Sequence, residues 1–171
     1  MSLESIKFKS GLLRSAVLAL PFVMLAATQS SAQGAGPFSG MAGAWNGTGA
    51  IALASGARER IRCRATYEVN EAGDNLKLDL RCASDSYKFS LSGNAQSSGG
   101  QVTGNWFEST RSVGGNISGR ASSGSIQATA AGQTFTALLN MRTSGNRQSV
   151  SITSPGSELS EVSITLSKGG R

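Results

Sequence analysis

From residue 44 onward the chain alternates apolar and polar residues in short runs that end at Gly, Ser or Asn. Alternation with a period of two predicts β-strands with one face toward a core and the other toward water. This part of the chain has no helical periodicity. We expect about ten strands, at 44–53, 58–69, 76–82, 87–92, 101–109, 113–121, 125–130, 135–143, 148–153 and 159–168, with a turn over 94–100.

The second and third of these strands carry the most specific signal, because two independent patterns choose the same pairing. Folding the chain about a turn at 70–75 places Tyr67 opposite Leu78 on the apolar face, and it also places Cys63 opposite Cys82. We therefore expect a disulfide between the two cysteines, with two buried free thiols as the alternative. In the chain-entropy account, closing a loop of this length stabilises the fold by about 3 kcal/mol.

Many short strands at even spacing predict an all-β fold, an antiparallel up-and-down meander of about 8–10 strands closed into a small barrel. A β-sandwich is the alternative, but closure removes exposed sheet edges. Glycines inside the strand patterns, such as Gly47 and Gly104, permit the coiling that a small barrel needs. We expect the interior to hold Ile61, Tyr67, Leu78, Leu80, Phe89, Leu91, Ile117, Ile126, Phe135, Leu139, Val150, Ile152, Val162, Ile164 and Leu166.

Residues 1–32 have the pattern of a secretory signal peptide, with a basic leader, an apolar core and a small-residue cleavage site. A retained membrane anchor fits less well, because Pro21 interrupts the apolar run and the run is shorter than the roughly 20 residues that span a bilayer. We expect 33–43 to be a flexible lead-in and barrel plug and 44–168 to be the barrel. The mature chain would have no transmembrane span and would be periplasmic or secreted.

Charge and composition limit the partners and the catalytic groups that we expect for this chain. The formal net charge is +6, and removing 1–32 lowers it to +4, which is less than a dedicated nucleic-acid binder carries, so we expect no nucleic-acid partner. The chain has no histidine, which excludes Ser-His-Asp and Cys-His catalysis, and oxidised cysteines would supply no thiolate. Four acidic residues are spread along the sequence, and we interpret them as solvated charges: Asp85, Glu108, Glu158 and Glu161. We expect no metal, no cofactor and no enzymatic activity.

Two features are candidates for binding. Tyr67, Trp106 and Phe135 would form the walls of a pocket for a small apolar or amphipathic ligand, with Arg64 or Arg142 near its mouth. An interior filled by its own side chains is the alternative.

The second feature is a stripe of alternate arginines on one face of the second strand, spaced by about 7 Å. Such a stripe suits an anionic component of the cell envelope or an acidic partner, and the alternative is an ordinary solvated face. An inside-out barrel associated with the outer membrane, with arginines lining the lumen, is a further alternative. The stripe consists of Arg58, Arg60, Arg62 and Arg64.

Gly43-Ala44-Trp45, preceded by Phe38 and Met41, resembles the start of calycin-type barrels such as lipocalins, avidins and bacterial periplasmic metalloprotease inhibitors. The resemblance implies that a short helical turn closes one barrel end, with Trp45 in the floor and Phe38 and Met41 beneath it. It also implies a cation over the Trp45 indole, from Arg142, Arg147 or Lys168. The lipocalin Thr-Asp-Tyr turn and a biotin-type polar set are absent.

The same resemblance adds an alternative function, a periplasmic inhibitor whose tail at 33–37 enters the cleft of an exported protease. The stretches 59–65 and 81–85 also resemble a family of uncharacterised exported alphaproteobacterial proteins. This resemblance implies no known activity. From the sequence we expect an exported, non-enzymatic barrel that acts as a ligand-binding or cell-envelope interaction protein.

Overall fold

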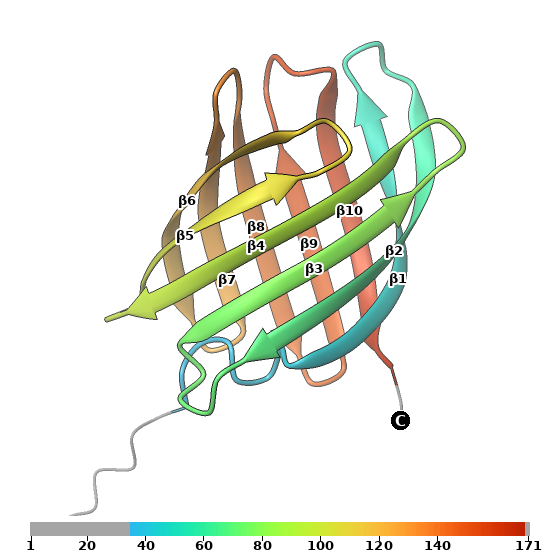
Figure 1. The fold of residues 1–171 in the computed structure, drawn as a ribbon. Coiled ribbons are helices and arrows are strands. Elements are labelled where there is room, and N and C mark those ends of the chain that lie inside the picture. The colour runs from blue at the N-terminus through green and yellow to red at the C-terminus, as the bar shows by residue number, and fades with distance from the viewer. Residues whose placement is uncertain (1–34, 170–171) are drawn as a thin grey trace, which may run out of the picture. The chain divides into compact units, whose positions relative to one another are not determined.

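A computed structural model describes residues 35–169, so the expected signal peptide at 1–32 lies outside the described residues. Each strand pairs with the next in antiparallel fashion, and the last strand pairs with the first, which closes a barrel (Figure 1). The predicted all-β meander is confirmed, and the sandwich alternative is wrong. The ten strands are β1 (Gly43–Leu53), β2 (Arg58–Val69), β3 (Asn75–Ala83), β4 (Lys88–Ser98), β5 (Gln101–Glu108), β6 (Val113–Ser122), β7 (Ser125–Gly132), β8 (Thr136–Ser144), β9 (Arg147–Thr153) and β10 (Leu159–Lys168).

β4 differs from the sequence prediction, which ended this strand early and placed a turn over 94–100. The strand continues to Ser98, and only Gly99 and Gly100 connect it to β5. Both glycines have positive φ, 57° and 80°, as a two-residue hairpin turn with the sheet's twist requires. Ala95 and Ser97 continue the inward alternation, but their small size weakens the pattern that the sequence shows.

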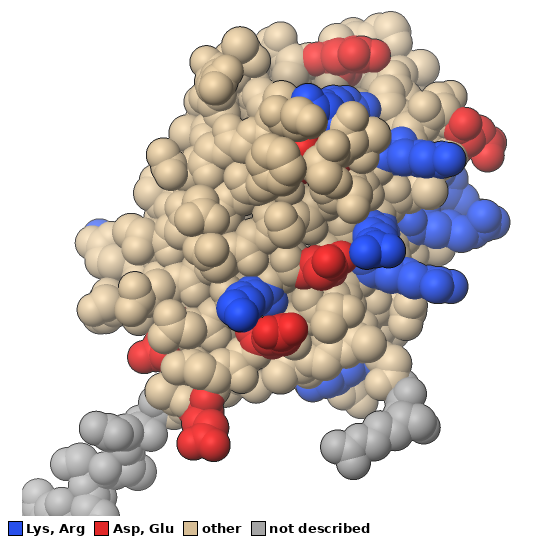
Figure 2. Space-filling model, in the orientation of Figure 1, with Lys and Arg blue, Asp and Glu red and all other residues tan. Residues whose placement is uncertain are grey.

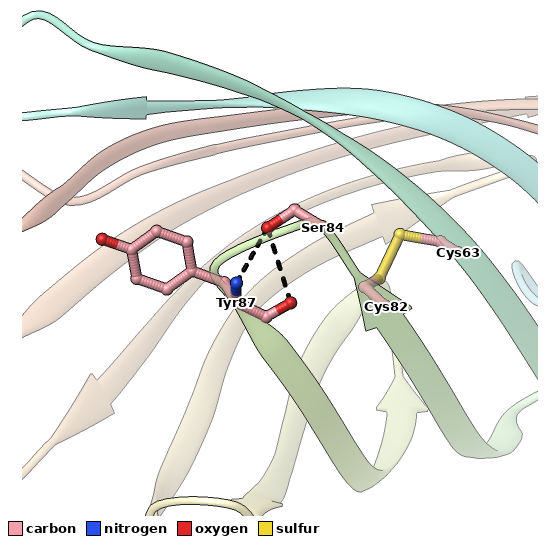
Figure 3. Close-up of a disulfide and its surroundings, with 4 residues drawn as sticks. All are labelled: Cys63, Cys82, Ser84 and Tyr87. Atoms are coloured by element: carbon pink, nitrogen blue, oxygen red, sulfur yellow. Dashed lines mark hydrogen bonds between the residues drawn. A yellow bond between two sulfur atoms is a disulfide. The ribbon is translucent and has the colours of Figure 1, made fainter.

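The register of β2 and β3 is the predicted one: Cys63 pairs with Cys82, and Tyr67 pairs with Leu78. The two cysteines form a disulfide across the hairpin, with their Cα atoms 4.1 Å apart (Figure 3). In the turn that follows β3, the Ser84 hydroxyl accepts a hydrogen bond from the Tyr87 amide at 2.9 Å.

A hydrogen-bonded turn before β1 closes one end of the barrel, in place of the helical turn that the calycin resemblance implies. The Gly36 amide donates to the Ala72 carbonyl at 2.8 Å, and the Phe38 amide donates to the Gly73 carbonyl at 3.0 Å. Gly73 has a φ of +72°, and a Cβ on it would overlap the Ser39 hydroxyl. From Gly36 onward, therefore, the expected lead-in is bonded to the turn between β2 and β3.

The strands keep their apolar residues inside and their polar residues outside. The most deeply buried side chains include Phe38, Met41, Trp45 and Leu166 at the closed end, and Ile51 and Ile61 farther along β1 and β2. The outward positions are mainly Ser, Thr, Asn, Gln and charged residues. A lipid-embedded barrel needs the reverse distribution. None of the described residues belongs to a helix that is long and apolar enough to cross a membrane.

Candidate ligand site in the barrel interior

Trp45 forms the floor of the interior. Its side chain is inaccessible to solvent, and its indole Nε1 donates to the Met41 carbonyl at 2.7 Å. Tyr67 meets it edge to face, with the ring centroids 6.4 Å apart. Among the three candidate cations, Lys168 occupies the place over the indole, with its Nζ 5.6 Å from the ring centroid. Gly43, the first residue of β1, has a φ of 114° and adjoins the Lys168 side chain.

A buried polar chain lies beside this floor. The Tyr67 hydroxyl donates to Gln148 Oε1 at 2.7 Å, and Gln148 Nε2 donates to Thr143 Oγ1 at 3.0 Å. Burial raises the pKa of the Tyr67 hydroxyl far above its ordinary value, so Tyr67 stays neutral. Tyr67 is thus a bonded part of the floor. Sequence analysis missed Gln148, although its position on β9 has the inward parity of Val150.

The interior is less completely buried away from the floor on β9 and β10. On β9 and β10 the inward residues nearer the closed end are buried, as at Val150 and Ile164, whereas the next inward residues, Ile152 and Val162, are half-buried. All four point inward, so burial on these two strands decreases away from the closed end. The other half-buried apolar residues that pack on the core are Leu53, Val69, Leu78, Leu80, Tyr87, Phe89, Ala95, Ile117, Leu139 and Leu159.

Trp106 and Phe135 line this open half together. In register, Trp106 stands between Gly93 and Gly115 on the neighbouring strands, so no inward side chain flanks it there. The Phe135 ring lies against it, with the centroids 5.6 Å apart. Trp106 is 7% exposed, and its indole Nε1 has no hydrogen-bond partner within residues 35–169. A buried N–H without an acceptor is costly, so the indole has an unused hydrogen-bond donor.

Glu108 lies at the rim and is buried, which corrects its interpretation as a solvated charge. Its carboxylate accepts hydrogen bonds from the backbone amides of Ser90, Thr110 and Arg111 at 2.9–3.0 Å. Burial by itself raises the pKa of this carboxyl, but the hydrogen bonds outweigh it and lower the pKa to about 2. Glu108 lies two residues after Trp106 on the same strand, so alternation along the strand places both side chains inside. This is the sequence signal for the position of Glu108.

Arg111 joins this rim to the aromatic side chains beside it. Its guanidinium lies 3.6 Å from the Glu108 carboxylate and 4.9 Å from the centroid of the Phe89 ring. Phe89 stacks in turn on Tyr87, whose hydroxyl donates to the Glu158 carboxylate at 3.0 Å. The rim therefore combines aromatic faces with fixed charges.

The structure brings only part of the predicted pocket together. Trp106 and Phe135 are in contact, and Tyr67 belongs to the floor. Arg64 and Arg142 differ from the expectation that they lie near the mouth, because both project from the outer face as neighbours of the inward residues Cys63 and Met141.

The arginine stripe also lies on the outer face, where Arg58, Arg60, Arg62 and Arg64 are all exposed on β2. Basic side chains gather along one edge of the molecule in Figure 2, on the side where Figure 1 draws β1 and β2. Within the described part of the chain, no group of three or more His, Cys, Asp or Glu is placed to hold a metal ion.

Comparison with known proteins adds a fold relationship. No family model and no curated protein sequence matches the chain. A solved structure that is similar is the S-type phycobiliprotein lyase CPES from Guillardia theta, with a TM-score of 0.53 and 10% sequence identity, over 78% of this chain and 91% of that chain. At this identity the similarity shows a shared fold alone.

The similarity corrects one expectation from the sequence, that the chain is not an enzyme. A barrel of the same fold bears the name of a lyase. The fold and the missing histidine are therefore not grounds for excluding enzymatic chemistry.

Proposed function

We propose that the barrel binds a small apolar or amphipathic ligand in its open half, with a hydrogen-bond acceptor of the ligand on Trp106 Nε1. The observation that carries the proposal is this donor, buried and unpartnered among the described residues, next to apolar side chains that solvent can reach. Ligand sites combine apolar walls with a few well-placed polar groups, and this lumen has both. The similar lyase supports the proposal at the level of the fold alone.

The ligand enters at the end opposite the plug. The Trp45 floor closes one end, and on β9 and β10 the half-buried residues Ile152 and Val162 lie away from it. The apolar part of the ligand contacts side chains such as Leu91, Ile117 and Leu139, while its acceptor replaces the hydrogen bond that the indole lacks. A ligand with both features gains more than a pure hydrocarbon, because only the former satisfies the donor.

Two fluorescent probes test this proposal. cis-Parinaric acid carries a carboxylate acceptor and diphenylhexatriene carries none. We expect both to bind, and we expect Trp106→Phe to weaken parinarate binding about tenfold while leaving diphenylhexatriene binding within about twofold, since a hydrogen bond to a charged acceptor is lost. Phe107→Leu is the matched control, because Phe107 is the adjacent residue on the outer face and is 47% exposed. Equal losses for both probes contradict the role of the indole, and no binding of either probe contradicts the proposal as a whole.

We also infer that the protein works outside the cytoplasm, in the periplasm or the medium. The disulfide supports this location, because oxidising compartments keep such bonds. Fractionation of the native host, with thiol labelling under non-reducing conditions, tests it. Recovery in the cytosol with two reactive thiols is the contradicting result.

A further inference from the structure

The outer face of the barrel has a second feature of its own, a hollow of about 600 Å³ over β7, β8, β9, β10 and β1. Hydroxyl and amide side chains line it, together with the small residue Ala50 on its β1 side. Its polar lining includes Thr48, Asn140, Ser149, Ser151, Ser163 and Thr165. Most of these side chains are exposed, so their hydrogen-bonding groups face solvent.

Arginines stand on both sides of this hollow. In register, Arg62 on β2 neighbours Thr48, and the same row continues through Thr165 and Ser149 to Arg142 on β8. Neighbouring strands are about 4.8 Å apart, so the two arginines are separated by about 19 Å along the sheet. A second row begins at Arg60 and crosses Ala50 into the hollow.

The arginines of the stripe lack counter-charges. The ion pairs among residues 35–169 do not involve Arg58, Arg60, Arg62 or Arg64. Glu59, on the same strand, points inward and its carboxylate accepts a hydrogen bond from the Ser84 hydroxyl at 2.7 Å.

The neighbouring strands do not neutralise the positive charge of the stripe. Arg64 stands directly opposite Arg81 of β3, and like charges in facing positions destabilise a sheet. Arg81 is itself within 3.5 Å of Asp79, in an exposed pair that contributes little. On the β1 side, Glu161 faces outward beyond Ala52, which separates it from Arg58 by one strand. The stripe is thus a row of arginines without ion pairs among residues 35–169, on the strand next to a polar hollow.

We propose that this face binds an acidic polysaccharide, with sugar hydroxyls in the hollow and acidic groups on Arg60 and Arg62. Arginine forms paired hydrogen bonds with carboxylate, sulfate or phosphate groups, and serine and threonine exchange hydrogen bonds with hydroxyls. A nucleic acid fits less well, because the lining of the hollow offers no aromatic side chain for base stacking. The proposal is independent of a ligand inside the barrel.

Polygalacturonate and dextran sulfate are the probes, neutral dextran is the control polymer, and the full mature protein is used. We expect both acidic polymers to bind and neutral dextran not to bind. The double variant Arg60→Ser/Arg62→Ser should weaken binding about tenfold or more, since charge-assisted hydrogen bonds are lost. Lys77→Ser/Lys88→Ser removes the same charge from β3 and β4, outside the hollow, and should change binding less than about threefold.

A charge-neutral variant separates the hollow from a general electrostatic surface. Ser163→Tyr places a bulky side chain in the hollow and should abolish binding of both acidic polymers, whereas Ser118→Tyr on the outer face of β6 should not. Ser149→Tyr repeats the test if Ser163→Tyr does not fold, as judged by circular dichroism. Failure of both acidic polymers to bind overturns the proposal. So does an unaffected Ser163→Tyr, or tighter binding to single-stranded DNA or to phosphatidylglycerol vesicles than to either polymer.

Discussion

Glu108 is a buried carboxylate that binds two backbone amides of the turn between β5 and β6 and one backbone amide of β4. Its pKa is lowered from 4.5 to about 2, so the folded state prefers the charged form. This preference stabilises the fold above about pH 4.5 and is lost as the pH falls toward 2, where the carboxyl is protonated in the folded state too.

Glu108→Gln should therefore lower the free energy of unfolding at pH 7 by about 2 kcal/mol, because a neutral amide accepts these hydrogen bonds more weakly. The difference from the wild type should shrink as the pH is lowered from about 4.5 to about 2. Urea denaturation at a series of pH values measures it. Asp85→Asn, at an exposed acidic residue, is the control and should leave the unfolding midpoint unchanged at pH 7. A difference that stays constant between pH 7 and pH 3 contradicts this account.

At this scale the sequence predicted side-chain direction better than side-chain partners. The alternation of inward and outward residues along a strand was enough to place Trp106 inside. The same rule, applied to Glu108 and Gln148, would have placed them inside as well. Their partners are backbone amides of a neighbouring turn and a tyrosine 81 residues away. The contacts of Gln148 with Tyr67 and of Glu108 with Ser90 join residues far apart in the sequence, so a pattern along the chain contains no signal for them, whereas Thr110 and Arg111 follow Glu108 within three residues.

The β2–β3 hairpin is the element that the sequence determined most completely. Its cysteines, its apolar face and its turn agree on one register, and the structure has that register. β4 is the contrasting element, because Ala95 and Ser97 are too small to mark an inward face. The strand is set instead by its pairing with β3 and β5, which strand propensity does not describe.

The disulfide cross-links residues 19 positions apart in this hairpin. Cys63→Ala/Cys82→Ala should lower the free energy of unfolding by about 3 kcal/mol, because the unfolded chain regains the entropy of the open loop. Chemical denaturation of the variant and of the wild type measures the loss. The wild type in excess dithiothreitol should behave as the variant does, and a variant with the wild-type midpoint contradicts the prediction.

The plug gives a second prediction at the level of elements. Gly73→Ala adds a Cβ in a left-handed turn and pushes it against Ser39 of the plug, whereas Gly56→Ala meets the same backbone strain, at a φ of +88°, with no atom within 4 Å. Both variants should lose about 1 kcal/mol to strain. Gly73→Ala should lose about 1–3 kcal/mol more, because the plug must shift.

Urea denaturation followed by tryptophan fluorescence measures both losses, since Trp45 lies against the plug. The native emission of Gly73→Ala should shift to longer wavelength as water reaches the floor, and that of Gly56→Ala should not. Equal losses of stability in the two variants contradict a plug that packs against the turn.

At the scale of the whole molecule, barrel size decides whether the interior can hold a ligand. Eight strands give a barrel that side chains can fill, and this barrel has ten. Strand number and closure followed from alternation and turn spacing in the sequence. The room for a ligand that we propose did not, because it depends on small inward residues on several strands meeting in three dimensions, as Gly93, Gly115 and Ala130 do around Trp106 and Ile117.

Ala130 and Ala131 give the sharpest test of that interior, because they are adjacent on β7 and face opposite sides. Ala130 faces the lumen between Ile117 and Ala137, and Ala131 is exposed on the outer face. Ala130→Trp should fill the lumen and weaken diphenylhexatriene binding by more than about tenfold, because the ligand loses the volume that buries it. Ala131→Trp adds the same side chain to the outer face and should leave binding unchanged.

If the lumen is open, Ala130→Trp should also keep the free energy of unfolding to within about 1 kcal/mol of the wild type, whereas a filled interior would lose about 1–3 kcal/mol to overpacking. Unchanged binding in Ala130→Trp would place the probe elsewhere, and a large loss of stability would show that side chains already occupy the interior.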